Sequence, residues 1–324
     1  MQYNITIQPA NITYKSESNL LEDALSQAIP LEYSCKTGDC ETCKAEVISG
    51  AVLNEHGQTI HKGNILTCQS KALTDTTLKA NYYPELTEIK IQTLPCKIAS
   101  IQQVTNDIII LTLRLPPTAN FEYLSGQYID LSFKNLKRSY SIANTKASSN
   151  ELELHIRKVP AGQMSDLLFN QFKENQLMRI EGPKGTFFAH KNEKPLILLA
   201  TGTGIAPIKA IVEQLIHEND PRKIYIYWGM QYEYELYCEN IKQYASKYDH
   251  ISFHPVLSRD NNWQGHKGYV QHAVITDFNS LTGVEIYACG SLQMIQQAKE
   301  LFTEHGLPSN AFYSDAFTPA KQSN

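Results

Sequence analysis

The chain has 324 residues, a formal net charge of −4 and a hydrophobic content of 42%, which is typical of a soluble protein with two or three domains. The near-neutral charge argues against nucleic acid as the main partner, because phosphate binding requires a basic face. The longest apolar run, near 196–200, is far shorter than the roughly 20 residues needed to cross a bilayer. With no signal peptide visible either, we expect a cytoplasmic monomer that binds neither membrane nor nucleic acid.

The amino-terminal segment predicts a small α+β unit. Residues 2–15 alternate apolar and polar side chains and therefore predict a two-stranded hairpin. Residues 18–30 have apolar side chains at helical spacing, with Ser18 or Asn19 as the N-cap, so we expect a helix there. Two further strands are expected, at about 44–48 and 73–80.

The character of the sequence changes twice along the rest of the chain. A linker with two prolines, 81–95, is followed to about 190 by short β-like runs with turn residues between them, which predict an antiparallel barrel. Beyond that point apolar strands alternate with helical segments, as in βαβ units on a parallel sheet. The expected domains are 1–88, 89–192 and 193–324.

Four of the seven cysteines follow the pattern C-x4-C-x2-C with one distant cysteine, namely Cys35, Cys40, Cys43 and Cys68. A zinc ribbon needs two C-x2-C pairs and only one is present, while a thioredoxin-like dithiol leaves Cys35 without a role. A disulfide framework is not expected in a reducing cytosol. The spacing is that of a plant-type [2Fe–2S] site, with Gly38 able to take a positive φ that lets backbone N–H groups approach the sulfurs. Zinc or unliganded thiols remain the alternatives.

On these residues the amino-terminal unit resembles the plant-type ferredoxins, which implies a β-grasp fold. Two departures stand out. Glu41 occupies a position, just after the second cysteine, where the family often has glycine, and the Cys43–Cys68 gap is a few residues shorter than usual. We expect both to affect the loop shape and the cluster potential without removing a ligand.

The middle segment contains three motifs in order: RSYSIA at 138–143, HIRKV with GQMS within 155–165, and EGPKGTF at 181–187. The first motif alone could be an ordinary edge strand. Together the three resemble the ferredoxin-NADP reductase superfamily, and this resemblance implies bound FAD.

The same resemblance implies a role for each matched residue. Arg138 holds the pyrophosphate, Tyr140 packs on the ribityl chain and isoalloxazine, and Ser141 hydrogen-bonds near flavin N5. Two further residues, Ile156 and Arg157, flank the flavin. Backbone amides at a helix start bind the pyrophosphate; they belong to Gly162, Gln163, Met164 and Ser165.

In the last segment TGTGIAP (201–207) follows an apolar strand and opens a helix, a place that favours pyrophosphate. It lacks the third glycine of the strict Rossmann fingerprint, but it resembles the G-T-G-x-x-P form of the reductase superfamily. Ala200 and Thr201 replace the two glycines that usually precede it. The nucleotide contacts implied by this resemblance are Gly202, Thr203, Gly204, Pro207, Gly229, Cys289 and Gly290.

Three residues near the carboxyl terminus have implied roles in hydride transfer. Cys289 lies beside the nicotinamide C4 by resemblance, although it could instead be a small buried residue. Asp315 either supports the transfer or caps a turn, and Phe317 is the candidate to cover the flavin.

The choice between NADH and NADPH depends on two features of the sequence. Ser258 and Arg259 could bind the 2′-phosphate of NADPH. The acidic segment MQYEYELY that follows Gly229 would repel that phosphate and suits a free ribose hydroxyl, so NADH is favoured.

The three modules predict an oxidoreductase. NADH gives up two electrons at once and a [2Fe–2S] cluster accepts one, whereas FAD accepts two and releases them singly. The expected path therefore runs from NADH to FAD, to the cluster and then to a partner protein that docks near the cysteine loop.

Along its whole length the chain most resembles the CDP-6-deoxy-Δ3,4-glucoseen reductase family, in part through NYYPEL and SDAF, which lie outside the cofactor motifs. That resemblance implies that the electron acceptor is a PMP-dependent iron–sulfur dehydratase acting on CDP-4-keto-6-deoxyglucose in dideoxysugar synthesis. The alternatives are the reductase component of an aromatic-ring dioxygenase or multicomponent monooxygenase, and a non-enzymatic ferredoxin-like binding module.

Overall fold

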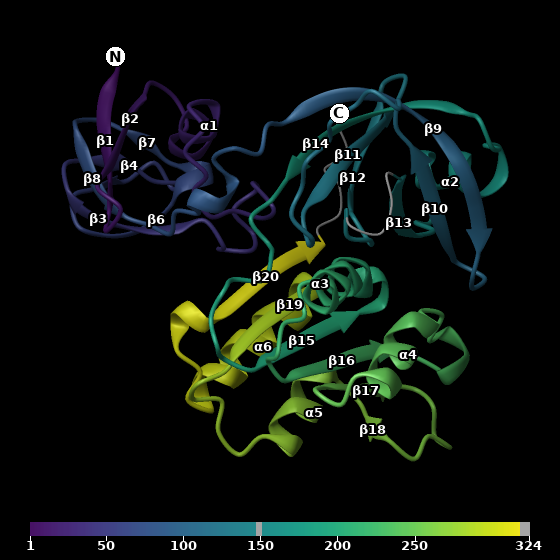
Figure 1. The fold of residues 1–324 in the computed structure, drawn as a ribbon. Helices are drawn as coiled ribbons and strands as arrows, with labels where there is room; N and C mark the ends of the chain where they lie inside the picture. The colour runs from purple at the N-terminus through teal and green to yellow at the C-terminus, as the bar shows by residue number, and fades with distance from the viewer. Residues whose placement is uncertain (147–150, 318–324) are drawn as a thin grey trace. The chain divides into compact units, whose positions relative to one another are not determined.

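The computed structural model describes residues 1–146 and 151–317, which form two compact units, Met1–Lys90 and Ile91–Asn324 (Figure 1). The first unit is built on a five-stranded sheet of order β2-β1-β8-β3-β6, in which β1 and β8 are parallel and the other neighbours antiparallel. Its strands are β1 (Tyr3–Gln8), β2 (Ile12–Ser16), β3 (Lys44–Ser49), β6 (Gly63–Leu66) and β8 (Thr76–Lys79). A second, three-stranded sheet contains β4 (Val52–Leu53), β5 (Thr59–Ile60) and β7 (Lys71–Ala72).

The single α-helix of this unit, α1 (Leu20–Ser26), begins where the sequence predicts. Asn19 is the N-cap, because its side chain accepts hydrogen bonds from the backbone N–H groups of Leu21 and Glu22. The helix ends earlier than expected because Ala28 has a left-handed φ of 57°. The order of hairpin, helix, cysteine loop and strands confirms the expected β-grasp arrangement.

The second unit starts with a six-stranded antiparallel sheet of order β12-β11-β14-β9-β10-β13. Its strands are β9 (Gln92–Gln103), β10 (Ile108–Arg114), β11 (Tyr128–Phe133), β12 (Leu136–Ser141), β13 (Glu151–Arg157) and β14 (Leu177–Lys184). A bridge between Ile142 and Leu154 links the two outer strands, so the sheet curls into the expected barrel. The helix α2 (Gln163–Asn170) follows β13 and buries Met164 and Leu168 in the barrel core.

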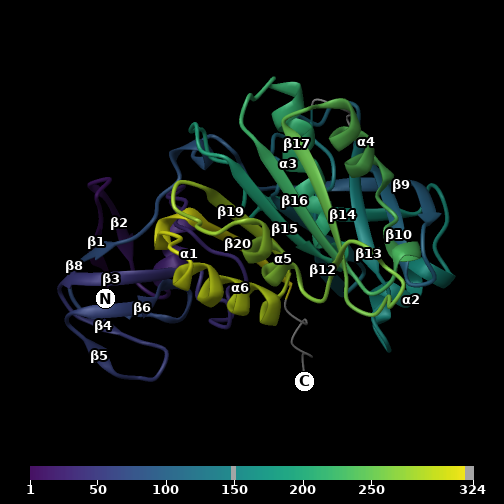
Figure 2. The ribbon, with the colours of Figure 1, turned by 90° about the horizontal axis from the view of Figure 1, so that it is seen from below.

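The carboxyl-terminal part is a parallel sheet of order β18-β17-β16-β15-β19-β20. Its strands are β15 (Leu196–Thr201), β16 (Ile224–Met230), β17 (Ile251–Leu257), β18 (His266–Lys267), β19 (Glu285–Ser291) and β20 (Phe312–Phe317). Its helices are α3 (Ile205–His217), α4 (Glu239–Lys247), α5 (Val270–Asp277) and α6 (Leu292–Glu304). Apolar side chains of α3 and α4 join one core cluster with the sheet, while α5 and α6 pack against each other elsewhere on it (Figure 2).

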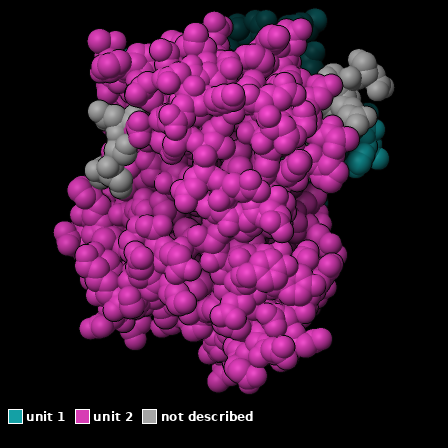
Figure 3. Space-filling model, turned by 90° about the vertical axis from the view of Figure 1, so that its right-hand side faces the viewer, with its two compact units in different colours: residues 1–90 teal, residues 91–324 magenta. Residues whose placement is uncertain are grey.

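The barrel and the parallel sheet belong to one compact unit and share part of a core. Ile108 and Phe187 of the barrel segment lie in the same buried cluster as Leu198 and Trp228 of the parallel sheet. In Figure 3 the described residues of this unit, 91–146 and 151–317, form one continuous magenta body. No helix in the described part of the chain is long and apolar enough to cross a membrane.

Candidate functional site

The four predicted cluster ligands lie together in the first unit. The Sγ atoms of Cys43 and Cys68 are 3.1 Å apart, and the thiol of Cys40 donates a hydrogen bond to Cys35, which lowers the pKa of Cys35 to about 4. The short connection after Cys43 still reaches Cys68, because the backbone N–H and the hydroxyl of Thr67 both bond to the Cys43 carbonyl, at 3.0 and 3.1 Å. The four thiols thus form two pairs.

This pairing argues against a single metal ion. Four thiolates around one zinc ion, at about 2.3 Å from the metal, would lie about 3.8 Å from one another. Among the described residues only His254, His266 and Asp277 bring three such ligand atoms within 4.8 Å of each other, so the cysteines do not. Two pairs of sulfurs fit a two-iron cluster, with one pair for each iron.

The backbone of the cysteine loop adopts left-handed conformations at Lys36, Gly38 and Glu41. Gly38 has a φ of 90°, as expected. The pKa of Cys68 is lowered chiefly by the hydrogen bond from Cys43, against the effect of burial, and the Gln69 side chain and the backbone N–H of Gly38 lower it further. Glu41 has a φ of 56°, a conformation that non-glycine residues adopt at a cost of about 1–2 kcal/mol. The loop therefore has a glycine-like conformation where this chain carries glutamate.

Replacing Glu41 with glycine is accordingly expected to leave the loop intact. The relief of backbone strain, about 1–2 kcal/mol, is largely offset by the greater freedom of glycine in the unfolded chain, roughly 0.5–1 kcal/mol. The rate of cluster loss to a chelator should stay equal or fall slightly, whereas Gly38→Ala, at a φ of 90°, should accelerate it. A much faster loss in Glu41→Gly would show that the carboxylate, and not the backbone, stabilises the loop.

The flavin motif RSYSIA lies on β12 and its continuation. Arg138 and Tyr140 alternate with exposed residues and so share one face of the strand, and the Arg138 guanidinium donates to the carbonyl of Lys137 at 2.7 Å. Ile156 is buried in the barrel core, so only its backbone can face a ligand. Arg157 pairs with Asp107 at 3.1 Å.

The start of α2 offers backbone amides, as the sequence predicts. Gly162 is the N-cap, and no side chain in the described chain caps this helix end. The hydroxyl of Ser165 is engaged in the preceding loop, where it bonds to the backbone N–H and carbonyl of Val159 at 3.2 and 3.1 Å. The amides of Gln163 and Met164 occupy the first turn, where the helix dipole favours an anion.

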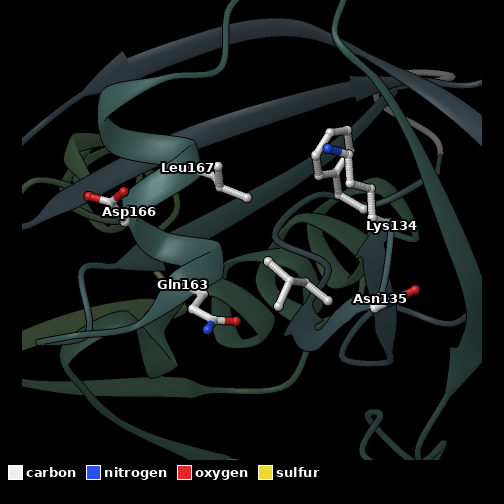
Figure 4. Close-up of a pocket in the computed structure, with 7 residues that line it drawn as sticks. Lys134, Asn135, Gln163, Asp166 and Leu167 are labelled. Atoms are coloured by element: carbon white, nitrogen blue, oxygen red, sulfur yellow. The ribbon is translucent and has the colours of Figure 1, made fainter.

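A hollow of about 440 Å³ lies beside this helix start (Figure 4). In the figure, Lys134 and Asn135 come from the turn between β11 and β12, and Gln163 and Leu167 come from α2. The lining is Phe133, Lys134, Asn135, Leu136, Gln163, Asp166 and Leu167. The apolar walls suit a planar base, and the charged groups of the lining are Lys134 and Asp166.

The glycine-rich turn of the parallel sheet connects β15 with α3. Trp228 donates its indole N–H to the Gly202 carbonyl at 2.9 Å, and the hydroxyl of Thr201 accepts from the Ser291 backbone at 3.4 Å. A Cβ on Gly204 would lie only 2.3 Å from the Cys289 carbonyl oxygen, so the turn packs directly on the end of β19. The remaining predicted contacts lie close to this turn. Thr203 is part of the turn and Pro207 is in the first turn of α3, while Gly229 and Gly290 lie near the ends of β16 and β19.

The three predicted catalytic residues come together from distant parts of the chain. Asp315 on β20 is directly opposite Cys289 on β19, and the hydroxyl of Ser141 from the barrel donates to the Asp315 carboxylate at 3.4 Å. Burial, and to a lesser degree Asp315, raises the pKa of Cys289 well above its usual value, so this thiol stays neutral. Phe317 ends β20 beside Ser291 and is partly exposed.

Ser258 and Arg259, the residues predicted to contact the 2′-phosphate, follow β17 and are exposed. Their backbone N–H groups donate to the carbonyls of Met230 and Gln231, respectively, at 3.0 Å each. The nearby acidic side chain of Glu235 accepts from the backbone N–H groups of Gln231 and Tyr232, at 2.9 and 3.2 Å. This carboxylate therefore shapes the loop after β16 instead of projecting from it.

Comparison with known proteins agrees with this layout. Three family models match in order: a 2Fe-2S iron-sulfur cluster binding domain over residues 5–73, an oxidoreductase FAD-binding domain over 95–188 and an oxidoreductase NAD-binding domain over 198–300. The CDP-6-deoxy-L-threo-D-glycero-4-hexulose-3-dehydrase reductase of Yersinia pseudotuberculosis is 47% identical over 99% of this chain and 100% of its own length. The chain belongs to this reductase family.

Two further proteins are similar to this dehydrase reductase family member. The ferredoxin–NAD(P)+ reductase component of the naphthalene 1,2-dioxygenase system of Pseudomonas putida is 29% identical over 97% of this chain and 98% of its own. A solved cytochrome P450 reductase from Amycolatopsis has a TM-score of 0.78 at 24% identity, over 98% of this chain and 99% of its own, and thus shares the fold.

This dehydrase reductase family member is an oxidoreductase that uses a [2Fe–2S] cluster, FAD and NADH, as its three matched domains indicate. Three residues have structural roles that no sequence motif assigns: Trp228 and Thr201 hold the glycine-rich turn, and Lys209 is buried in α3. The signal for Lys209 was present, since it is a lone lysine among apolar residues of IAPIKAIV.

Proposed function

We propose that this reductase delivers electrons from NADH, by way of FAD and the [2Fe–2S] cluster, to a PMP-dependent CDP-4-keto-6-deoxyglucose 3-dehydratase. The full-length identity of 47% to a hexulose-3-dehydrase reductase carries this proposal. The dioxygenase reductase component is 29% identical over nearly the same share of the chain. The two relatives therefore differ in identity and not in coverage, and the higher identity favours a dehydratase as the electron acceptor. A reductase component of an oxygenase is the second candidate.

The residues of the first unit would hold the cluster. Cys35 and Cys40 would bind one iron and Cys43 and Cys68 the other, in keeping with the two thiol pairs. The backbone N–H of Thr37 lies 3.4 Å from the Cys35 sulfur, and such bonds to sulfur tune the potential of an iron–sulfur site.

The residues of the barrel would hold FAD. We place this FAD domain at 89–192, after a ferredoxin domain of 1–88 and before a nucleotide domain of 193–324. Arg138 and the helix start that follows Gly162 would bind the pyrophosphate, and Tyr140 would pack on the flavin. The hollow of Figure 4 would take the adenosine end, because its apolar walls and Lys134 lie beside that helix start.

The nucleotide domain would hold NADH across the ends of its parallel strands, where this class of sheet binds ligands. The turn Gly202–Gly204 precedes the amino-terminal end of α3, a favourable place for pyrophosphate. Bound FAD accepts a hydride from NADH and passes single electrons to the cluster. Ser141 and Asp315 would orient and hydrogen-bond the reacting groups, and the buried Cys289 would shape the wall behind them.

Removing the Ser141 hydroxyl is expected to slow hydride transfer. Ser141→Ala loses a hydrogen bond to Asp315 at the reacting centre, worth about 1–1.5 kcal/mol, so NADH-driven flavin reduction should slow roughly tenfold. Ser139→Ala on the same strand, which removes a bond to Asp130 at 2.6 Å and leaves the bond from Ser141 to Asp315 in place, is the control and should keep the wild-type rate. Equal rates in both variants, measured by stopped-flow absorbance, would exclude Ser141 from the reaction.

The partner is tested by reconstitution. The purified reductase is mixed anaerobically with NADH, a PMP dehydratase and CDP-4-keto-6-deoxyglucose, and in parallel with a Rieske oxygenase and its aromatic substrate. Formation of the 3-deoxy product, with little oxygenase turnover, is the expected result. Turnover of the oxygenase without 3-deoxy product would overturn the proposal in favour of the second candidate.

A further inference from the structure

A buried ion network crosses from the barrel to the nucleotide domain within the second unit. At its centre is Lys209 on α3, which is only 5% exposed. Its Nζ lies 2.7 Å from a carboxylate oxygen of Glu213, one turn along the same helix, and 3.2 Å from Glu153 on β13 of the barrel. The same ammonium donates to the backbone carbonyl of Ala143, also of the barrel, at 3.1 Å.

Both carboxylates have further partners that extend the network. Glu213 accepts from the Tyr244 hydroxyl at 2.7 Å and from the backbone N–H of Thr145, in the barrel segment, at 3.4 Å. Glu153 accepts from His155 Nε2 at 2.8 Å, and the other ring nitrogen meets the Tyr237 hydroxyl of the nucleotide domain at 3.0 Å. Each side of the contact thus supplies groups that bond to the other side.

The charge states make this network a specific contact. Burial alone would lower the pKa of Lys209, but Glu153 and Glu213 outweigh that effect and raise it. Burial likewise would raise the pKa of Glu153, but the hydrogen bond from His155 and the charge of Lys209 outweigh burial and lower that pKa. Buried ion pairs contribute little net stability compared with apolar packing, while breaking one leaves an unpaired charge. The network is therefore better suited to fixing one relative placement of two surfaces than to adding stability.

The position of the network connects the two cofactor-binding elements. Ala143 is the last residue of the flavin motif RSYSIA and lies two residues after Ser141, just beyond the end of β12. Lys209 lies on the helix that opens directly after Gly202–Gly204. Hydride transfer depends steeply on the separation of donor and acceptor atoms, and a misplacement of about 1 Å can reduce a rate about 100-fold.

We propose that Lys209 is a positioning residue whose bonds to Ala143, Glu153 and Glu213 hold the nucleotide domain against the barrel at the separation that hydride transfer requires. The proposal rests on the proposed function, in which the C4–H bond of NADH breaks and its electron pair forms the new N–H bond at flavin N5, leaving NAD+ and the reduced flavin anion. Lys209 itself touches neither reacting atom, so it acts through the placement of the two surfaces.

The test compares Lys209→Met with Lys242→Met, which removes an exposed lysine of α4 in the same domain. In the FAD- and cluster-loaded protein, Lys209→Met is expected to slow NADH-driven flavin reduction 10- to 100-fold and to weaken the charge-transfer absorbance of the reduced flavin with NAD+. Electron transfer from photoreduced flavin to the cluster should keep its wild-type rate, since it does not involve the nucleotide domain. Lys242→Met should match wild type in every measurement.

A second readout does not depend on activity. In protein freed of FAD, amide hydrogen exchange of the segment that contains Ala143 and Thr145 should be faster in Lys209→Met than in wild type. Should Lys209→Met fail to fold, the variant Glu153→Gln/Lys209→Met/Glu213→Gln removes all three charges together, and the same losses are expected from it.

The outcomes distinguish this inference from the function on which it rests. Wild-type flavin reduction and wild-type amide exchange in a folded Lys209→Met or triple variant would overturn the positioning role alone. Failure of the loaded wild-type protein to oxidise NADH would overturn the proposed function and the positioning role with it.

Discussion

Replacing Cys40 with serine is expected to abolish electron delivery to a protein acceptor, by at least about 100-fold, while NADH-dependent ferricyanide reduction through FAD continues. Cys40 belongs to one of the two thiol pairs, and a two-iron cluster requires thiolate ligands from all four cysteines. The FAD-binding and NAD-binding domains, matched over 95–188 and 198–300, lie in the other compact unit, Ile91–Asn324, so the variant should keep its flavin. Cluster absorbance, the rate of reduction of a protein acceptor and the ferricyanide rate are measured on the same preparation.

The matched control for this variant is Cys96→Ala, which removes a buried thiol from the barrel core. It is expected to reduce stability by about 1 kcal/mol and to keep both activities. Simultaneous loss of both activities in Cys40→Ser would contradict the independence of the two compact units.

Gly204→Ala is expected to lower the free energy of unfolding of the nucleotide domain by about 3 kcal/mol or more and to abolish NADH oxidation. Gly204 has an ordinary φ of −61°, so alanine meets no conformational barrier there. The difficulty is steric, because the new Cβ would lie 2.3 Å from the Cys289 carbonyl oxygen and 3.1 Å from the Gly290 Cα. Both obstacles are backbone atoms, so relief requires α3 to move away from β19.

The control is Gly283→Ala, in the same domain. Its φ is 85° and no atom lies within 4 Å of the added Cβ, so only backbone strain of about 1–2 kcal/mol is expected. Thermal unfolding and NADH oxidation are compared for the two variants. Equal behaviour of the two would show that the close approach of the turn to β19 does not matter for NADH binding.

Much of the fold follows from local patterns in the sequence. The alternation in residues 2–15 predicts β1 and β2, and Asn19 before an apolar helical repeat predicts the start of α1. The change from short β-like runs to strands that alternate with helices separates the barrel from the parallel sheet. These features depend on neighbours in sequence, so the sequence contains them directly.

Other features depend on long-range packing and could not be predicted. The helix expected to reach Pro30 ends at Ser26, since Ala28 takes a left-handed conformation. The bond from Ser141 to Asp315 joins residues 174 positions apart, and only a resemblance suggested that they meet. Lys209 donates to the carbonyl of Ala143, 66 positions away in the sequence, and no sequence motif predicts that contact.

Electrons are expected to pass from NADH to the cluster only by way of FAD. The most direct measurement mixes NADH with the protein anaerobically and follows flavin absorbance and the cluster's electron paramagnetic resonance signal, with and without FAD. With FAD, flavin reduction should come first and cluster reduction second, and without FAD the cluster should stay oxidised. Cluster reduction at the same rate in the FAD-free protein would contradict this electron path, as would a cluster that stays oxidised beside fully reduced flavin.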